Sequence, residues 1–199
     1  MTYEFEHKAH EDGFAVVCGV DEAGRGPLAG PVYAAAVILP DGLEDLGIND
    51  SKKMSEKKRE QLFDVITDNA TAYGIGFATE KEIDEINILN ATFLAMRRAV
   101  EAMGVKPDLV LVDGNRKPNT GYEELTLVKG DAKSISISAA SILAKVSRDR
   151  YMKELAQRHP EYKFEQHKGY GTKLHYEMIE QYGILPDHRL SFLKKILEK

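Results

Sequence analysis

The feature that most constrains this chain is an apolar segment that runs directly into two adjacent carboxylates. Residues 14–20 are all apolar or small, and Asp21 and Glu22 follow at once. A short apolar run of this kind, bounded by polar residues, is typical of a buried strand. A Gly-Arg-Gly tripeptide at 24–26 comes next, so the strand is expected to end at the acids and enter a loop that can approach a ligand closely. This arrangement favours an active site over a structural turn.

The rest of the chain alternates between strand signals and helix signals. Short apolar runs bounded by turn residues indicate strands, and apolar residues that recur at helical spacing indicate helices. Asn87 or Asn90 is expected to divide one long helix in two. The expected strands are 14–20, 32–39, 72–78, 108–115 and 125–128. One expected helix begins at residue 55, and four others span 81–104, 136–158, 175–182 and 191–197.

This order of elements predicts an α/β domain with a mixed sheet and helices packed on it. The first two strands are joined by the glycine loop, so they are expected to be neighbours. The strands that end at Val20 and Val112 are apolar throughout and are therefore expected at the centre of the sheet.

Composition places the chain among ordinary globular proteins, and its 199 residues suit one domain. Cys18 is the single cysteine; it is expected to be a buried small residue, and it cannot form an internal disulfide. Residues 1–12 are polar and acidic, and no apolar run approaches the ~20 residues of a membrane span. We therefore expect a soluble cytoplasmic protein with no membrane contact.

Charge is distributed unevenly along the chain. The net charge is −5, yet residues 129–199 carry 14 Lys and Arg against 9 Asp and Glu. A basic C-terminal third on an acidic body can supply a local surface that binds phosphate. On charge alone, a solvated helical surface explains the same surplus equally well.

Acids recur at the ends of strand-like segments. Asp21 and Glu22 follow the first strand, Asp113 ends a later one, and Asp131 follows another. If these ends lie side by side, the carboxylates repel one another and favour hard divalent cations such as Mg²⁺ or Mn²⁺. Asp and Gly also form turns, and for the Asp-Gly pair at 113–114 taken alone the turn is the favoured interpretation. Neighbours on a regular strand point to opposite faces, so Asp21 and Glu22 can share a site only if the strand ends or twists there.

Two loops are candidates for binding phosphate. Gly24 and Gly26 allow close backbone approach and Arg25 offers a guanidinium fork, although the spacing is not that of a Walker A loop. Ser51 and Lys52 precede a helix start, where backbone N–H groups and lysines can hold a phosphate. A solvated helix cap is an equally good interpretation of that second loop.

The C-terminal half adds candidates for contact with a nucleic acid. Lys145 and Arg148 are expected to face a groove from the helix at 136–158, with an ordinary amphipathic helix as the alternative. Tyr170 lies between two glycines and is a candidate stacking platform for a sugar or base, with a core tyrosine as the alternative. His188 and Arg189 either touch a phosphate or cap the last helix.

Taken together, these motifs closely resemble the bacterial type 2 ribonuclease H family (ribonuclease HII). The resemblance extends from Gly19 to Phe192, and its first motif is the most specific. Type 3 relatives carry an extra N-terminal substrate-binding domain, whereas only 13 residues precede the first strand here, which favours type 2. The matching stretches are 19–32, 50–53, 112–115, 129–131, 138–149 and 167–172.

The resemblance implies a ribonuclease H-like fold, with a five-stranded mixed sheet flanked by helices. Residues 1–199 would form a single catalytic domain in which a helical part, about 160–199, contacts the substrate. The implied activity is endonucleolytic cleavage of RNA in RNA–DNA hybrids, together with incision on the 5′ side of single ribonucleotides embedded in DNA. The implied partner is therefore nucleic acid, with a monomeric protein as the default.

The resemblance also assigns roles to residues. Asp21, Glu22, Asp113 and Asp131 become the catalytic carboxylates that hold two Mg²⁺ or Mn²⁺ ions. The loop at 24–26 senses the ribose 2′-OH through its backbone, and Tyr170 stacks on the sugar at the RNA-to-DNA junction. The products would be a 3′-hydroxyl and a 5′-phosphate. Two alternatives are a hybrid-binding protein without catalysis and an ATPase with a related sheet.

Overall fold

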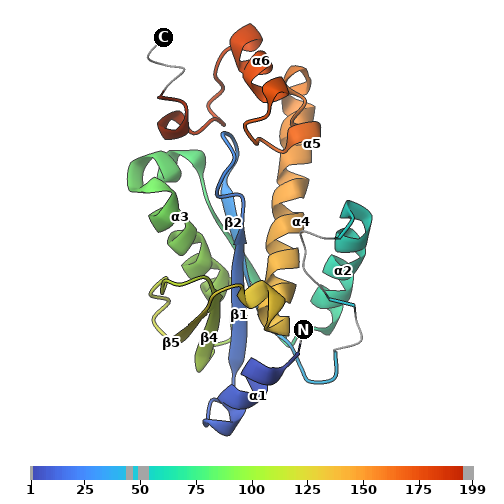
Figure 1. The fold of residues 1–199 in the computed structure, drawn as a ribbon, viewed down its shortest axis with the longest axis vertical. Helices are drawn as coiled ribbons and strands as arrows, with labels where there is room; N and C mark the ends of the chain where they lie inside the picture. Colours follow the sequence, from blue (N-terminus) through green and yellow to red (C-terminus); the bar gives the residue numbers. More distant parts are fainter. Residues whose placement is uncertain (1, 44–46, 49–53, 195–199) are drawn as a thin grey trace.

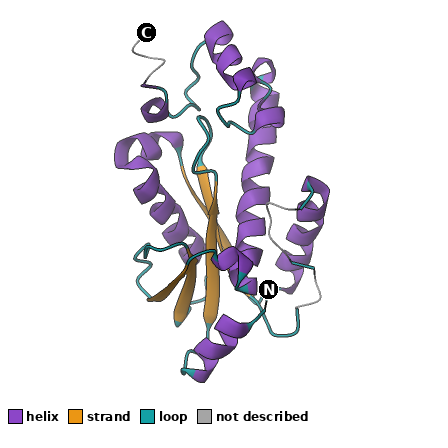
Figure 2. Ribbon diagram, in the orientation of Figure 1, coloured by secondary structure: helices purple, strands orange, loops and turns teal. Residues whose placement is uncertain are grey.

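Five strands form one mixed sheet in the computed structural model, which describes residues 2–43, 47–48 and 54–194 (Figures 1 and 2). The strand order is β3-β2-β1-β4-β5, so β1 and β4 lie inside the sheet, as expected from their apolar sequences. β1 pairs antiparallel with β2 and parallel with β4. The strands are β1 (Val17–Ala23), β2 (Val32–Ile38), β3 (Ala72–Ala78), β4 (Leu109–Asp113) and β5 (Glu123–Leu127).

The expectation that the first strand ends at the acids is wrong. β1 begins three residues later than expected and continues through both carboxylates to Ala23. Asp21 pairs with Ala35 of β2, and Ala23 pairs with Tyr33. The ladder to β2 therefore carries the strand past the end of its apolar segment, because backbone pairing does not require apolar side chains.

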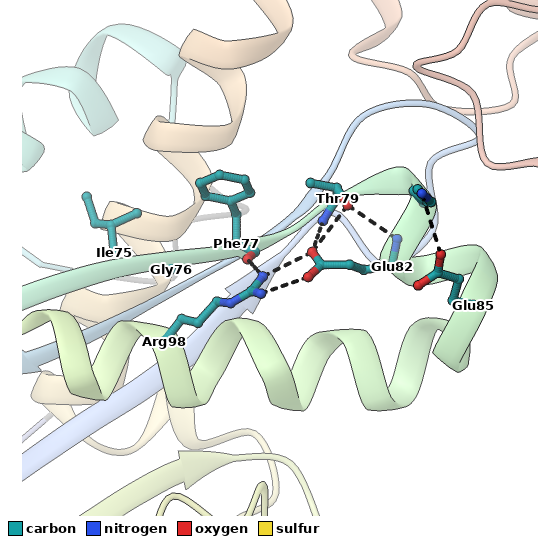
Figure 3. Close-up of a pocket in the computed structure, with 8 residues that line it drawn as sticks. Ile75, Gly76, Phe77, Thr79, Glu82, Glu85 and Arg98 are labelled. Atoms are coloured by element: carbon teal, nitrogen blue, oxygen red, sulfur yellow. Dashed lines mark hydrogen bonds and ion pairs between the residues drawn. The ribbon is translucent and has the colours of Figure 1, made fainter.

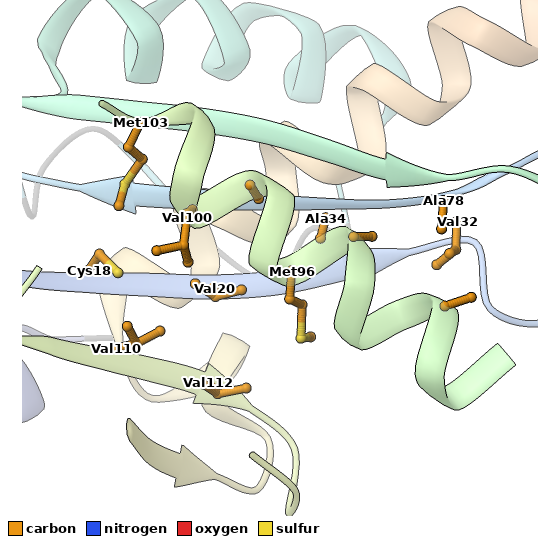
Figure 4. Close-up of a cluster of buried hydrophobic side chains, with 14 of the residues drawn as sticks. Cys18, Val20, Val32, Ala34, Ala78, Met96, Val100, Met103, Val110 and Val112 are labelled. Carbon is orange, nitrogen blue, oxygen red and sulfur yellow. The ribbon is translucent and has the colours of Figure 1, made fainter. Parts of the chain in front are cut away.

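Helices cover both faces of the sheet. Helix α3 (Glu80–Ala102) lies on one face, where Met96 and Val100 pack against Val20 and Val112 (Figure 4). Helices α2 (Glu56–Asn69) and α4 (Ile135–Arg158) belong to the core on the other face. Cys18 is buried in the α3-side core as expected, and burial raises the pKa of its thiol to about 12.

Helix α3 shows both a local start signal and a local break. Thr79 and Glu82 form a reciprocal capping box, which satisfies two backbone donors at the helix start. Asn87 has a φ of 67°, outside the helical region, so it is Asn87 and not Asn90 that divides the helix. Asn tolerates this conformation better than most residues do.

Helix α4 approaches β1 unusually closely. A Cβ atom on Gly19 would collide with the backbone of Ser136 and Ile137, in the first turn of α4. Only glycine leaves room for that turn, which sets α4 directly above the strand that carries Asp21. Ser134 caps the helix by accepting a hydrogen bond from the Ile137 N–H.

The C-terminal elements pack around the far half of α4 (Figure 1). The described part of the expected helix at 191–197 contains the end of the 3₁₀ turn η5 and the helical residue Lys194, and residues 195–197 lie outside the described residues. None of the helices in the described segments is long and apolar enough to cross a membrane. The elements are η4 (Pro160–Tyr162), α5 (Phe164–His167), α6 (Lys173–Tyr182) and η5 (Leu190–Phe192).

Candidate active site

The parallel pairing of β1 and β4 brings two acids to the same level of the sheet. Val20 pairs with Val112, so Asp21 and Asp113 occupy the next position on adjacent strands. Neighbouring strands lie about 4.8 Å apart, which allows the two carboxylates to interact directly. The predicted meeting of acids from two strands is therefore present for this pair.

Asp21 is the most buried of the predicted acids, at 4% exposure. Its Oδ1 accepts a hydrogen bond from the Glu22 N–H at 2.7 Å, and its carboxylate also bonds the Ser141 side chain on α4. Burial raises the pKa of Asp21 well above its usual range, and the charges of Glu22 and then Asp113 raise it further. Burial and repulsion therefore shift this carboxyl toward its protonated form when no cation compensates its charge.

Glu22 reaches the same region from the opposite face of β1. The cross-strand partner of Asp21, Ala35, belongs to the α4-side core, whereas Ala34, the partner of Glu22, belongs to the α3-side core. The strand does not end at the acids, yet the Glu22 charge still acts on Asp21. A break in the strand is therefore not needed for the two carboxylates to interact.

Asp131 is placed through the segment that follows β5. Asp113 Oδ1 accepts a hydrogen bond from the Gly130 N–H at 2.7 Å. Gly130 begins the short 3₁₀ helix η3 (Gly130–Ala132), which contains Asp131 at 7% exposure. Hence Asp131 follows directly on a residue that is bonded to Asp113.

The donor chemistry of these four acids fits a hard divalent cation. They offer only carboxylate oxygens, the ligands that Mg²⁺ and Mn²⁺ prefer. Within the described part of the chain, no three acidic, histidine or cysteine side chains are already grouped so that they could hold a metal ion. The case for a cation therefore rests on the Asp21 carboxyl, since a bound positive charge would offset the burial and the repulsion that raise its pKa.

Arg189 holds the Gly-Arg-Gly loop from the interior. Its Nη2 donates to the Gly24 carbonyl at 2.6 Å, its Nη1 to the Arg25 carbonyl at 2.9 Å, and its Nε to the Gly30 carbonyl at 2.8 Å. Arg189 is completely buried, and burial, followed by the charge of Arg148, lowers its pKa to about 9. The expected phosphate contact of Arg189 is wrong because its guanidinium is buried, whereas Arg189 does occupy the N-cap position of η5, without a capping bond from its side chain. No local signal could reveal a contact between residues 165 positions apart.

The expected orientation of Arg148 toward a groove is also wrong. Arg148 is completely buried, and its Nη2 donates to the carbonyls of Ala29 and Lys168 at 3.2 and 3.0 Å. Gly24 has a φ of +94°, and a Cβ atom there would collide with the Arg148 side chain. The physical reason is that α4 is buried on most of its circumference here, so that Arg148 lies beneath the loop instead of in solvent.

Tyr170 stands beside the loop with its ring partly in solvent. It is 42% exposed, and a Cβ atom on Gly26 would lie 3.8 Å from its ring carbon Cε1. The Arg148 guanidinium lies 5.7 Å from the centre of the ring. The predicted exposure of Tyr170 between flexible glycines agrees with this placement.

The remaining predicted substrate contacts are Lys145, Ser51 and Lys52. Lys145 is half-buried and forms an ion pair with Asp149 at 2.7 Å. Ser51 and Lys52 lie outside the described residues. Sequence reasoning did not single out Lys133, which is exposed and lies two residues after Asp131. Much of the C-terminal basic surplus is therefore buried or ion-paired, whereas Lys133 is an exposed cation.

Two hollows in the described surface lie away from the acids. One has a volume of about 630 Å³ and is lined by α2 and C-terminal residues such as Glu56 and Lys168. The other, of about 610 Å³, lies beside edge strand β3, where Arg98 donates to Glu82 and to the Phe77 carbonyl (Figure 3). The hydrogen bond from Arg98 lowers the pKa of Glu82 to about 2. The bond from Arg98 to the Phe77 carbonyl connects α3 to β3. None of the four predicted acids lines either hollow.

The chain is similar to known proteins over nearly its whole length. A family model described as "Ribonuclease HII" matches residues 18–195. Ribonuclease HII from Caldicellulosiruptor bescii is 55% identical over 195 residues, which cover 98% of this chain and 95% of that protein. Both similarities include the strands and the loop that carry the predicted site.

Solved structures share the same architecture. The ribonuclease H2 from Pyrococcus horikoshii OT3 has a TM-score of 0.77 and 32% identity, over 92% of this chain and 97% of that one. Bst-RNase HIII, solved in complex with Mn²⁺, has a TM-score of 0.68 and 18% identity, over 88% of this chain and 65% of that one. At that identity the second similarity supports the fold alone. The predicted ribonuclease H-like fold is confirmed.

Proposed function

The chain belongs to the ribonuclease HII family, and we propose how its acids, its Gly-Arg-Gly loop and Tyr170 divide the work of the reaction. The protein is an endonuclease that cleaves RNA in RNA–DNA hybrids and cuts at ribonucleotides embedded in DNA. Its substrate is therefore nucleic acid, and its family is metal-dependent. The roles of individual residues in this activity are our proposal.

In our proposal, Asp21, Glu22, Asp113 and Asp131 hold two divalent ions, either Mg²⁺ or Mn²⁺. When bound, such ions supply an activated water and stabilise charge on the leaving oxygen. Asp21 would be the central ligand of these ions, because it is the buried carboxyl on which the charges of Glu22 and Asp113 act. The cut would lie on the 5′ side of the ribonucleotide and leave a 3′-hydroxyl and a 5′-phosphate.

The contacts of Arg189 set the orientation of the loop backbone. Arg189 binds the carbonyls of Gly24 and Arg25 from the interior. In a planar trans peptide the N–H points away from the carbonyl, so the N–H groups of Arg25 and Gly26 point away from Arg189. We propose that this loop contacts the ribose 2′-OH, which then serves for recognition and not as the nucleophile.

Tyr170 would complete the recognition of the junction. Its partly exposed ring lies beside Gly26, so a sugar bound at the loop would lie within reach of the ring. Aromatic rings stack on sugars and bases without needing a hydrogen-bond code. Lys145, Ser51 and Lys52 remain proposed phosphate contacts, whereas Arg148 would act by positioning the loop.

The wider organisation is proposed on the same basis. We propose that residues 1–199 act as one catalytic domain in which the part at 160–199 contacts the substrate. A monomeric state and a cytoplasmic location complete the proposal. Packing of the C-terminal elements on α4 and on Leu28 and Ala29 supports the single domain.

An Asp21→Asn variant tests the metal-site proposal. We expect cleavage to fall by more than about 100-fold, because loss of an outer partner alone typically costs 10–100-fold. Binding to a hybrid in EDTA should change little, and thermal stability should be equal or higher, because a buried carboxyl under repulsion is removed. Asp12→Asn, on the exposed end of α1 (Glu4–Glu11), is the control. Near-normal cleavage by Asp21→Asn with Mg²⁺ would contradict the proposal.

A further inference from the structure

Three histidines are buried together in the C-terminal part of the molecule. His175 and His188 are 0% and 1% exposed, and His167 is 7% exposed. The rings of His167 and His175 are stacked with centroids 4.3 Å apart. None of these residues has a role in the reaction proposed above, so their burial calls for a separate explanation.

Hydrogen bonds connect two of these rings in a line. The Leu185 N–H donates to His188 Nδ1 at 3.0 Å, and His188 Nε2 lies 3.1 Å from His175 Nε2. At the other end, His175 Nδ1 lies 3.0 Å from the carbonyl oxygen of Tyr170. The hydrogen bonds therefore run from the Leu185 N–H through both imidazole rings to the Tyr170 carbonyl.

The two backbone groups at the ends of this line determine which ring nitrogens of His175 and His188 carry a proton. The Tyr170 carbonyl can only accept, so His175 carries its proton on Nδ1 and leaves Nε2 as an acceptor. The Leu185 N–H can only donate, so His188 accepts on Nδ1 and carries its proton on Nε2. The contact between the two Nε2 atoms then has one donor and one acceptor. This pattern exists only while both rings are neutral and in opposite tautomers.

Electrostatics favours the same neutral state. Burial lowers the pKa of His175 to about 4, and the nearby His167 contributes in the same direction. Burial also lowers the pKa of His188 to about 4. The nitrogens of His167 are occupied as well, by the Gly169 N–H and the Tyr162 carbonyl. With all their ring nitrogens in hydrogen bonds, the three rings do not form a metal site.

This line of hydrogen bonds joins the Tyr170 segment to the turn at 185–189. Both segments support residues that we propose recognise the junction. At one end the line holds the Tyr170 carbonyl, which also accepts the Thr172 N–H at 2.8 Å. At the other end, His188 is followed directly by Arg189, whose guanidinium binds the carbonyls of Gly24 and Arg25. The turn at 185–189 is thus the shared support of Tyr170 and of the Gly-Arg-Gly loop.

We propose that His175 and His188 are positioning residues that set the Tyr170 ring relative to the Gly24–Gly26 loop, and so determine the preference for a ribonucleotide junction. This inference rests on the role proposed above for Tyr170. Neither histidine touches the substrate. They act through the Tyr170 backbone, by a hydrogen bond whose direction is fixed by the tautomers of both rings.

A pair of substitutions at one position tests the proposal. In His175→Leu the donor to the Tyr170 carbonyl is lost, whereas in His175→Asn a side-chain amide nitrogen lies near the former Nδ1 and can still donate. Cleavage is measured as kcat/KM on a DNA duplex with one ribonucleotide and on a continuous RNA–DNA hybrid, and the ratio of the two is the junction preference. His7→Leu, at an exposed position on α1, is the matched control.

We expect His175→Leu to lower the junction preference by about tenfold, the typical effect of one lost hydrogen bond. His175→Asn should retain most of the preference, and His7→Leu all of it. Combining His175→Leu with Tyr170→Ala should give no further loss beyond Tyr170→Ala alone, because both changes act through one ring. Equal losses on both substrates, or full additivity in the double variant, would overturn the positioning role.

Failure of the role proposed for Tyr170 is distinguishable from failure of the role proposed for the histidines. If Tyr170→Ala leaves the junction preference unchanged, the role of Tyr170 is wrong. If Tyr170→Ala loses the preference and His175→Leu keeps it, only the role of the histidines is wrong. Should His175→Leu not fold, ¹⁵N NMR of the unaltered protein at pH 7 decides. We expect a proton on Nδ1 of His175 and on Nε2 of His188, and any other tautomer pair would overturn the inference.

Discussion

A buried guanidinium is costly to desolvate, and two of them, Arg148 and Arg189, lie beneath the Gly-Arg-Gly loop. Each is stabilised by several carbonyl oxygens instead of by a carboxylate partner. Arginine suits this task, because its planar fork presents several donors in fixed directions. At the scale of single residues, the shape of the Gly-Arg-Gly loop is therefore set from the protein interior.

An Arg189→Lys variant tests this role. A lysine has one nitrogen and cannot reach the carbonyls of Gly24, Arg25 and Gly30 together, so buried acceptors lose partners at about 1–3 kcal/mol each. We expect a lower melting temperature and a junction preference reduced at least about fivefold, through misplacement of the loop. Arg158→Lys, on an exposed side chain, is the control. A lower melting temperature with unchanged junction preference would show that Arg189 only stabilises the fold.

Residues of the site differ in how far the sequence predicts them. The proximity of Asp21 and Asp113 was predictable, because both acids lie at the C-terminal side of apolar strand-like runs that the sequence shows, although β1 continues past Asp21. The buried arginines were not, since a basic residue in a helix normally indicates solvent. Their orientation depends on the loop packed above α4, and local periodicity carries no information about that packing.

At the scale of elements, the distance between α4 and β1 decides where Asp21 lies. Gly19 permits the first turn of α4 to approach the strand, and Ser141, further along α4, bonds the Asp21 carboxyl. The spacing of a helix on a sheet is thus connected to the environment of Asp21, a proposed catalytic group two residues from the contact.

A Gly19→Ala substitution should therefore be strongly destabilising. The new methyl group meets the backbone of Ser136 and Ile137, which cannot rotate away as a side chain can. Overpacking of this kind typically costs 1–3 kcal/mol, so we expect the melting temperature to fall by about 3–10 °C. Gly104→Ala, where open space surrounds the new methyl group, should show only the cost of a positive φ, about 1–2 kcal/mol. Calorimetry that ranks Gly104→Ala as the more damaging change would contradict the close approach.

Helix α1 shows what element prediction misses. The sequence of residues 4–11 is mostly polar, with too few apolar residues to mark a buried face. Its anchor is Glu6, which accepts hydrogen bonds from the Ser134 hydroxyl and the Ser136 N–H, 128 and 130 positions away. A tertiary contact with the start of α4 thus supports a helix that its own sequence barely specifies.

At the scale of the whole molecule, an acidic protein acts on a polyanion. The net charge is −5, and much of the C-terminal basic surplus is buried or ion-paired. We therefore expect binding to depend on a small number of exposed cations, such as Lys133, which lies two residues after Asp131 in the sequence. The alternating order of strands and helices predicted the sheet correctly, because this level of structure follows from apolar periodicity alone.

Salt dependence tests the contribution of these local cations to binding. We expect KM for a hybrid to rise with salt, with a slope of log KM against log salt that reflects a few phosphate contacts. Lys133→Ala should reduce this slope by about one. Lys106→Ala, an exposed change just before β4 begins and therefore remote from Asp113, should leave the slope unchanged. Equal slopes for the two variants would exclude Lys133 as a phosphate contact.

The most direct test of metal-dependent cutting at a junction is a cleavage assay on a DNA duplex with one embedded ribonucleotide, in Mg²⁺, Mn²⁺ or EDTA. We expect a single metal-dependent nick on the 5′ side of the ribonucleotide, with a 3′-hydroxyl and a 5′-phosphate at the cut. Cleavage that persists in EDTA, or a 2′,3′-cyclic phosphate product, would contradict this mechanism. Cleavage in EDTA would mean that the four carboxylates do not act through metal ions, and a 2′,3′-cyclic phosphate would mean that the 2′-OH is the nucleophile.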